Sequence, residues 1–161
     1  MAAMKPRIAV FVDVQNIYYT TRQAFQRHFN YRALWEKLSG QGDIVTAIAY
    51  ATERGDAGQQ KFQSALKHIG FDVKLKPFIQ RSDGSAKGDW DVGITIDVLE
   101  TAPEVDVVVL LSGDGDFDVL LKKIRRDMGV RAEVYGVERL TANSLVLAAD
   151  TFHPISEDLL I

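Results

Sequence analysis

The 161-residue sequence contains no cysteine, which excludes a disulfide framework and a metal site built on thiolates. It also lacks an apolar run long enough to cross a membrane. The short apolar run at the N-terminus leads directly into Asp13, where a signal peptide would have a small-residue cleavage site. Internal repeats and low-complexity tracts are absent as well. We therefore expect one cytoplasmic domain spanning residues 1–161, with no membrane partner.

The sequence also has no excess of positive charge, since its formal net charge is −3. This value disfavours a protein that coats DNA through bulk charge. It does not exclude an enzyme that cleaves RNA. A nuclease site that holds cations is itself acidic, and its acids offset basic residues elsewhere.

Runs rich in β-branched residues alternate with amphipathic stretches along the chain, and two of the runs are almost continuously apolar. Such runs are typical of strands that are covered on both faces. The alternation predicts a single three-layer α/β domain with a central, mainly parallel β-sheet. Strands are expected at Arg7–Val14, Ile44–Ala51, Phe71–Ile79, Val105–Leu111 and Ala132–Tyr135. Helices are expected near Tyr18–His28, Tyr31–Leu38, Gln59–Ile69, Val92–Glu100, Phe117–Met128 and Leu140–Ala149.

The C-terminal segment HPISEDLLI is expected to add a short edge segment or to pack across the domain. Together with the helix expected before it, this apolar tail fits either a homodimer surface or part of the core.

Acidic residues follow two of the expected strands. The first strand ends at Asp13, and the fourth runs into the sequence SGDGD, which contains Asp114 and Asp116. The carboxyl ends of parallel strands open into the same crevice, so these three carboxylates converge if the two strands are neighbours. Their repulsion then favours a bound cation, and oxygen ligands favour Mg²⁺ or Mn²⁺.

A purely structural role is the alternative for each of these acids. An aspartate between a strand and a helix commonly caps the helix, and acids in the first turn favour the helix dipole. The coincidence of Asp13, Asp114 and Asp116 on two strand ends favours the metal site. Asp118 is expected to face solvent.

A third acidic group lies in the sequence KGDWDVGITID, where a helix is expected to begin. Asp89 fits a capping residue, whereas Asp91 in the first turn is able to reach the metal. Asp97 lies about 120° around the helix from Asp91. We therefore expect Asp97 to bond a neighbouring loop or to orient a group that contacts the metal.

Other motif interpretations fail in detail. A dinucleotide loop starting at Gly113 would have Asp118 in place of its third glycine, and a calcium loop would have Arg125 in place of its glutamate. A phosphatase with an aspartyl nucleophile usually has a second acid where Gln15 stands.

Taken together, the three acidic segments resemble those of the NYN domain family, in particular its LabA-like branch, within the PIN-like nuclease superfamily. The resemblance implies a Rossmann-like PIN-type fold and RNA cleavage that depends on Mg²⁺ or Mn²⁺. The matching segments are FVDVQN (residues 11–16), KGDWDV (residues 87–92) with the later Asp97, and SGDGDF (residues 112–117). The positions that correspond to the family's acids and asparagine are Asp13, Asn16, Asp91, Asp97, Asp114 and Asp116.

The expected metal ligands and catalytic acids are therefore Asp13, Asp91, Asp114 and Asp116. Asn16 is expected to orient a carboxylate or a water, with a helix cap as its alternative role. Single-stranded RNA is the expected partner. The residues expected to hold it are Ser112, Lys87, Arg54, Tyr19 and Arg22, with packing or turn formation as the alternative for the tyrosine and the serine.

Three other functions stay open on the sequence alone. The first is a catalytically silent regulatory module that keeps the metal pocket and binds RNA or a protein. The second is a phosphohydrolase or a flap-type DNA nuclease that uses the same carboxylates. The third is a nucleotide-sugar transferase of the DxD type, although the chain lacks a large second half for an acceptor.

Overall fold

The computed structural model describes residues 5–53, 57–77, 79–80, 86–87 and 89–161. For residues 77, 79, 80, 86 and 87 it describes the backbone alone. The strands are β1 (Arg7–Asp13), β2 (Asp43–Glu53), β3 (Asp72–Pro77), β4 (Ile79–Gln80), β5 (Ala86–Lys87), β6 (Val107–Leu111), β7 (Arg131–Gly136) and β8 (Thr151–Pro154). The α-helices are α1 (Val14–Phe25), α2 (Tyr31–Ser39), α3 (Ala57–Ile69), α4 (Asp91–Thr101), α5 (Asp118–Met128) and α6 (Asn143–Ala148). Short 3-10 turns are η1 (Ala102–Glu104), η2 (Gly115–Phe117), η3 (Glu138–Leu140) and η4 (Glu157–Leu159).

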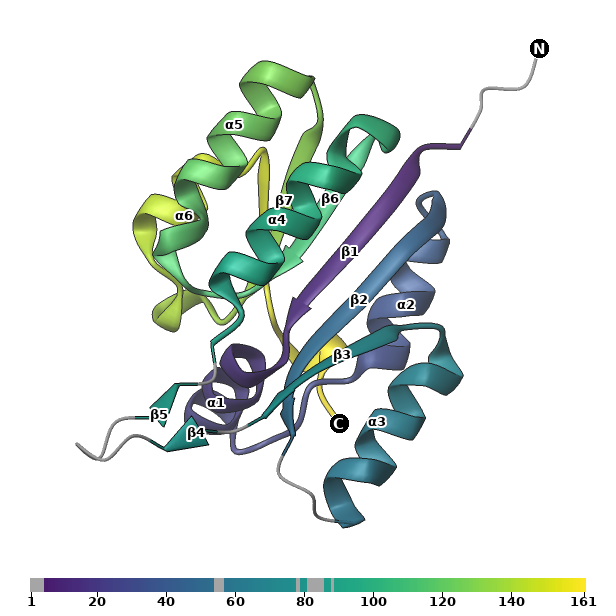
Figure 1. Cartoon of the computed structure of the whole chain (residues 1–161), viewed down its shortest axis with the longest axis vertical. Helices are drawn as coiled ribbons and strands as arrows, with labels where there is room; N and C mark the ends of the chain where they lie inside the picture. The colour runs from purple at the N-terminus through teal and green to yellow at the C-terminus, as the bar shows by residue number, and fades with distance from the viewer. Residues whose placement is uncertain (1–4, 54–56, 78, 81–85, 88) are drawn as a thin grey trace.

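Six parallel strands form the central sheet in the order β3-β2-β1-β6-β7-β8 (Figure 1). The chain starts at β1 in the middle, adds β2 and β3 on one side, and returns to add β6, β7 and β8 on the other. Strands β4 and β5 form a small antiparallel pair outside this sheet. The expected three-layer α/β fold with a mainly parallel sheet is therefore confirmed.

Helices cover both faces of the sheet, which explains the continuous apolar runs. In β1, Val10 and Val12 pack with buried residues of α1, α2 and α3. The alternating residues Ala9 and Phe11 pack with buried residues of α4, α5 and α6. Every β1 residue from Ile8 onward is buried, because neither face of this strand meets water.

Several boundaries differ from the expected ones. Helix α1 starts directly after β1, whereas the expected helix began at Tyr18. The expected strand up to Ile79 is interrupted, because β3 ends at Pro77. The C-terminal segment supplies the edge strand β8, which pairs with β7.

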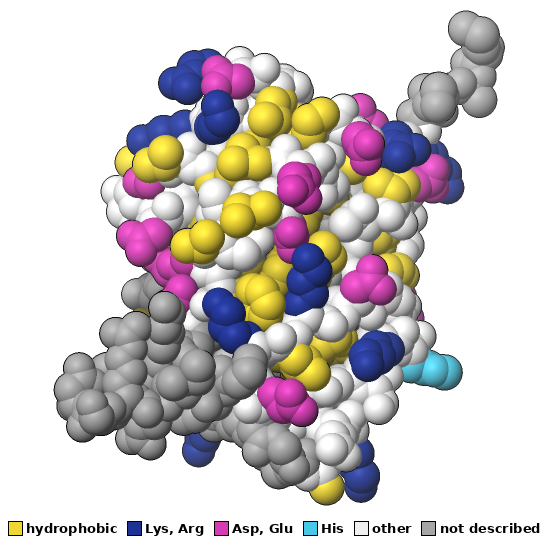
Figure 2. Space-filling view, viewed as in Figure 1, with side chains coloured by type: hydrophobic (Ala, Val, Ile, Leu, Met, Phe, Trp, Pro, Cys, Tyr) yellow, Lys and Arg dark blue, Asp and Glu magenta, His cyan; other side chains and the backbone are white. Residues whose placement is uncertain are grey.

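Helix α6 and the tail contribute mainly to the core, which was one of the two alternatives for them. Leu145, Ala148 and Leu159 are buried, whereas Leu147 is exposed. The face drawn in Figure 2 has Lys and Arg scattered among Asp and Glu, with hydrophobic side chains between them. None of the described helices combines the length and apolarity needed to span a bilayer.

Candidate metal centre at the sheet edge

The site lies where the strand order reverses. Strands β1 and β6 are parallel neighbours, and Val12 pairs with Leu111 at their carboxyl ends. Asp13 and Ser112 are the next residues of the two strands. Their connections leave toward opposite faces of the sheet, since α1 packs on one face and α4 and α5 on the other. In open α/β sheets this reversal creates the crevice in which ligands bind.

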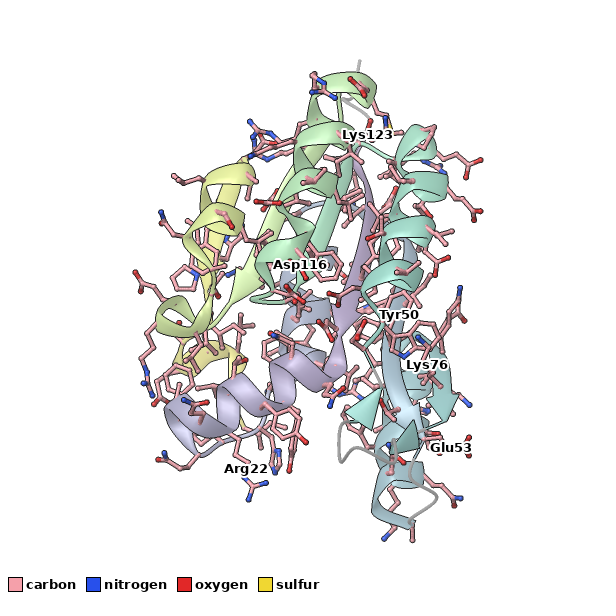
Figure 3. All side chains as sticks on the ribbon, turned by 60° about the vertical axis from the view of Figure 1, so that its left-hand side comes forward. Arg22, Tyr50, Glu53, Lys76, Asp116 and Lys123 are labelled. Carbon is pink, nitrogen blue, oxygen red and sulfur yellow. The ribbon has the colours of Figure 1, made fainter. Side chains whose placement is uncertain are left out.

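Three carboxylates meet in this crevice. One oxygen each of Asp91, Asp114 and Asp116 lies within 4.8 Å of the others. Asp91 is the first residue of α4, whereas Asp114 and Asp116 belong to the loop and 3-10 turn between β6 and α5. Figure 3 shows Asp116 in this connection. The structure thus brings together acids that are far apart in the sequence.

Asp13 is linked to this trio by a buried serine. The Ser112 hydroxyl donates to Asp13 Oδ2 at 3.0 Å, and its oxygen accepts from the Asp114 backbone N–H at 3.1 Å. Ser112 is fully buried. Its one proton goes to Asp13 in this arrangement, so the expected donation to a substrate phosphate stays a prediction and requires that bond to break.

Asn16 fixes the same loop from the other side. Its side-chain oxygen accepts from the Gly113 backbone N–H at 2.8 Å, so the start of α1 is tied to the loop after β6. This bond differs from the helix cap considered as its alternative role. Asn16 therefore determines where Asp114 lies relative to Asp13.

The alternative role of the acids, capping the helices that follow them, is seen for some of them and not for others. Asp114 accepts from the Asp116 backbone N–H at 2.9 Å, as a cap of the 3-10 turn does. Asp13 occupies the cap position of α1, and the Asn16 backbone N–H is close enough to its carboxylate to lower its pKa, although the contact falls outside regular capping geometry. The expectation that Asp89 caps α4 is wrong by one residue. Trp90 holds that position, and Asp89 instead accepts from the Asp91 N–H at 3.3 Å.

The electrostatics of the crevice disfavour negative charge. Burial raises the pKa of Asp13 to about 6, a shift that the Ser112 hydrogen bond partly offsets and the charge of Asp114 increases. Burial raises the pKa of Asp91 to about 7, and a hydrogen bond to Asp114 and the neighbouring acids add to the shift. Both groups thus bind protons in a pH range where ordinary aspartates are ionised.

In the part of the chain that the structure describes, no basic side chain compensates these acids. Among the residues that the structure describes, no Lys, Arg or His forms an ion pair with Asp13, Asp91, Asp114 or Asp116. Hard carboxylate oxygens without nitrogen or sulfur ligands suit a divalent cation such as Mg²⁺ or Mn²⁺. The residues present therefore fit the expected cofactor class.

Asp97 lies outside the trio and is held by two partners. Its Oδ2 accepts from the Tyr50 hydroxyl and from Lys74 Nζ, each at 2.7 Å. Tyr50 pairs in register with Asp13 across β1 and β2. Asp97 thus anchors α4 to β2 and β3, and its expected role in orienting a group that contacts the metal stays a prediction.

Sequence analysis missed the residues that hold the start of α4. The Trp90 indole N–H donates to the Ala51 carbonyl at 2.9 Å. Lys76 Nζ lies 4.6 Å from the centre of the Trp90 ring and donates to the Asp89 carbonyl. The one feature of the sequence that indicated this contact is the tryptophan within an acidic motif. In the structure, Trp90 connects the start of α4, where Asp91 lies, to β2.

Of the residues expected to hold RNA, Ser112 lies at the acids, whereas Tyr19 and Arg22 lie on α1. Tyr19 is exposed on α1, and Arg22 lies in the last turn of that helix (Figure 3). The Arg22 guanidinium donates to the Tyr18 hydroxyl at 3.1 Å. Arg54 and the side chain of Lys87 lie outside the described part of the chain.

The loop that carries Asp114 leaves no room for a methyl group at Gly113. A Cβ there would lie 2.7 Å from the Leu140 carbonyl oxygen, which belongs to the backbone and moves only with η3. We expect Gly113→Ala to lower the free energy of unfolding by about 1–3 kcal/mol, as overpacking commonly does. Urea denaturation measures the change. In the control Gly40→Ala, the nearest atom would be 3.5 Å away, and we expect a change within about 0.5 kcal/mol. An equal effect of both substitutions would contradict this account.

Comparison with known proteins identifies the family of the chain. The NYN domain family matches residues 7–157, which is nearly the whole chain. The chain therefore belongs to the NYN domain family, as its three acidic segments led us to expect.

Among curated proteins, the chain is similar to the low amplitude and bright protein LabA of Synechococcus elongatus. The two are 28% identical over 168 residues, covering 98% of this chain and 88% of LabA.

Among solved structures, the chain is similar to VPA0982 of Vibrio parahaemolyticus, a protein of unknown function. The identity is 48%, the TM-score is 0.94, and the match covers 100% of this chain and 99% of that one. A ribokinase from Giardia lamblia matches at 11% identity with a TM-score of 0.52, over 94% of this chain and 58% of that one, which reflects the fold alone.

Proposed function

We propose that this protein is a ribonuclease that hydrolyses phosphodiester bonds of single-stranded RNA with Mg²⁺ or Mn²⁺. The observation that carries the proposal is the meeting of Asp91, Asp114 and Asp116 within 4.8 Å, beside buried Asp13 and with no ion pair to a described basic residue. Membership of the NYN domain family supports the same activity.

The side chains divide into ligands and groups that position them. Asp91, Asp114 and Asp116 would offer oxygens to the metal, and Asp13 would offer its carboxylate from the end of β1. A bound divalent cation supplies an activated water and neutralises charge on the phosphate. Ser112 holds Asp13 in place through its hydroxyl, so an ionised Asp13 keeps one fixed orientation.

Positioning extends beyond the acids. Asn16 fixes the loop of Asp114, and the Tyr50–Asp97 bond fixes α4, which carries Asp91. Two rigid anchors therefore set the spacing between acids that come from different elements. Such pre-organisation matters because a displacement of about 1 Å costs on the order of a hundredfold in rate.

The test is cleavage of labelled single-stranded RNA by the purified protein with Mn²⁺, with Mg²⁺ and with EDTA. We expect cleavage with either metal and none with EDTA. Single-stranded DNA and a small phosphomonoester serve as competing substrates, and we expect both to be cleaved more slowly than RNA.

Matched variants separate the site from contamination. We expect Asp114→Asn to lower the rate by at least about a hundredfold, because a ligand oxygen loses its charge. Asp118→Asn changes an acid at the start of α5 that lies outside the trio, and we expect it to leave the rate within about twofold. Equal activity in all three proteins would refute the assignment. Metal binding without cleavage would instead indicate a binding module that keeps the metal pocket.

A further inference from the structure

A second concavity lies on the other side of β1 and β2 from α4. It has a volume of about 750 Å³ and is enclosed by α1, α2, α3 and the end of β2. This volume is within the range of small-molecule sites. Rings of Tyr18, Tyr19, Tyr31 and Phe62 are part of its lining. We call this concavity the aromatic pocket.

The aromatic pocket begins next to the metal centre. Val14 and Gln15 line it and directly follow Asp13. On the neighbouring strand, Ala51 and Thr52 line it just beyond Tyr50, the residue in register with Asp13. A polymer bound at the acids therefore has only the end of the sheet to cross before it reaches the pocket.

One hydrogen bond connects the two sites directly. The Ala51 carbonyl, on the pocket wall, accepts from the indole of Trp90, the residue before Asp91. This bond thus holds the pocket wall and the start of α4, the helix that carries Asp91, together.

Two of the rings, those of Tyr18 and Tyr19, are accessible, whereas Tyr31 is buried. The exposed fractions are 39% for Tyr18 and 46% for Tyr19, values that mark a surface for contact and not a closed core. Tyr18 and His28 are stacked, with 27° between their planes. Stacked, partly exposed rings are the platform on which unpaired bases pack, and each such contact contributes about 1–3 kcal/mol.

Three arginines line the aromatic pocket or the hollow beside it, and one of them, Arg27, forms an ion pair with Glu157. An adjoining hollow of about 500 Å³ shares Tyr18 and His28 with it and adds Arg22 and Arg27. Arg32 lines the pocket itself and is exposed. The charges match what a phosphodiester chain needs outside a pocket that holds its base.

Polar groups complete the pocket. Asn30, Thr52 and Gln59 belong to its lining, and the Gln59 amide donates to the Thr52 carbonyl. Hydrogen-bonding groups among rings suit the edge of a base better than they suit a lipid chain.

We propose that the aromatic pocket binds a nucleobase of single-stranded RNA close to the phosphate held at the aspartates, while the arginines contact neighbouring phosphates. This inference rests on the proposed function, because it makes the pocket part of the same RNA path. It adds a base-dependent component to binding that the acids cannot supply.

The experiment measures binding by fluorescence anisotropy in EDTA, so that no cleavage is needed. The probes are a labelled short oligouridylate and an abasic ribose-phosphate chain of equal length and charge. We expect the wild-type protein to bind the oligouridylate at least about fivefold more tightly, the lower end of one stacking contact.

Two tryptophan substitutions on α3 test the location. Ala65 is exposed and lines the pocket, so Ala65→Trp fills it while removing no core side chain. The adjacent Ser64 is exposed but is not part of the lining, so Ser64→Trp is the matched control. We expect the preference for bases to disappear in Ala65→Trp and to persist in Ser64→Trp. Thermal melting verifies that both variants are folded.

Arg32→Gln tests the phosphate contacts separately. We expect it to weaken binding of the base-containing and the abasic chain by the same factor, because a phosphate contact is independent of the base.

The outcomes distinguish this inference from the proposed function. Metal-dependent cleavage by wild type together with equal binding of both probes would overturn the pocket and leave the ribonuclease standing. A base preference that is lost only in Ala65→Trp, without cleavage under any metal, would support the pocket and overturn the ribonuclease. An unchanged base preference in Ala65→Trp would also overturn the pocket.

Discussion

Asp13→Asn is expected to make the metal-free protein more stable at about pH 8 while lowering RNA cleavage by about a thousandfold or more. The gain in stability and the loss of cleavage have one cause. The crevice holds a carboxylate that the fold alone disfavours, and the activity requires its charge.

The sign follows from the raised pKa of this group. Folding shifts the pKa of Asp13 from 3.8 to about 6, so the folded protein holds a proton that the unfolded chain releases between these values. The protonated Asp13 therefore contributes its full share to the free energy of unfolding below about pH 4, and this contribution is lost as the pH rises through about 6. A shift of this size corresponds to about 3 kcal/mol, and the asparagine escapes that cost. For a chain of this length, the melting temperature should rise by several degrees, at about 2–4 °C per kcal/mol.

Thermal melts at about pH 8 and about pH 5 measure the effect, with the difference expected to shrink at the lower value. Added Mn²⁺ should raise the melting temperature of the wild type much more than that of Asp13→Asn, because a ligand that binds only the folded state stabilises it. Asp118→Asn serves as the control and should follow the wild type in both experiments. If Asp13→Asn melts at a lower temperature than the wild type at about pH 8 without metal, the ionised Asp13 carboxylate does not destabilise the folded protein, which contradicts this prediction.

The fold and the meeting of the acids were accessible from the sequence for a definable reason. The apolar runs of β1 and β6 indicated strands covered on both faces, with Asp13 at the end of β1 and Asp114 three residues after the end of β6. Because parallel strands end at one edge, neighbouring strands were enough to bring the acids together. Asp91 was predictable from its place at the start of an apolar helix. A side chain in the first turn of a helix that packs on the sheet lies near the sheet's carboxyl edge.

What the sequence did not reveal depends on contacts between distant segments. Ser112 resembled a turn residue with a free hydroxyl, and only the register of β1 with β6 directs its proton to Asp13. The partners of Asp97 come from β2 and β3, and no spacing rule relates Tyr50 or Lys74 to it. The aromatic pocket was hidden for the same reason, because three helices and a strand end contribute to its lining.

The second large effect concerns pH and the affinity for metal. Mn²⁺ should bind about a thousandfold more weakly at about pH 5 than at about pH 8, because protons compete for the same carboxylates. Burial raises the pKa of Asp91 to about 7 and that of Asp13 to about 6. Affinity should therefore change little above about pH 8 and fall about tenfold per unit between about pH 7 and 6. Below that it should fall up to about a hundredfold per unit, since both groups then carry protons.

Calorimetry in buffers of different ionisation enthalpy counts the protons released when Mn²⁺ binds. Independent groups with these pKa values predict a release of about 1.4 protons at about pH 6 and almost none at about pH 8. Circular dichroism across the range separates loss of affinity from loss of fold. An affinity that stays constant from about pH 8 to 5 would mean that the cation is held elsewhere, whereas the predicted slope would tie it to Asp91 and Asp13. Cleavage measured at limiting Mn²⁺ should fall along the same curve, and excess Mn²⁺ should restore it, since mass action displaces the protons.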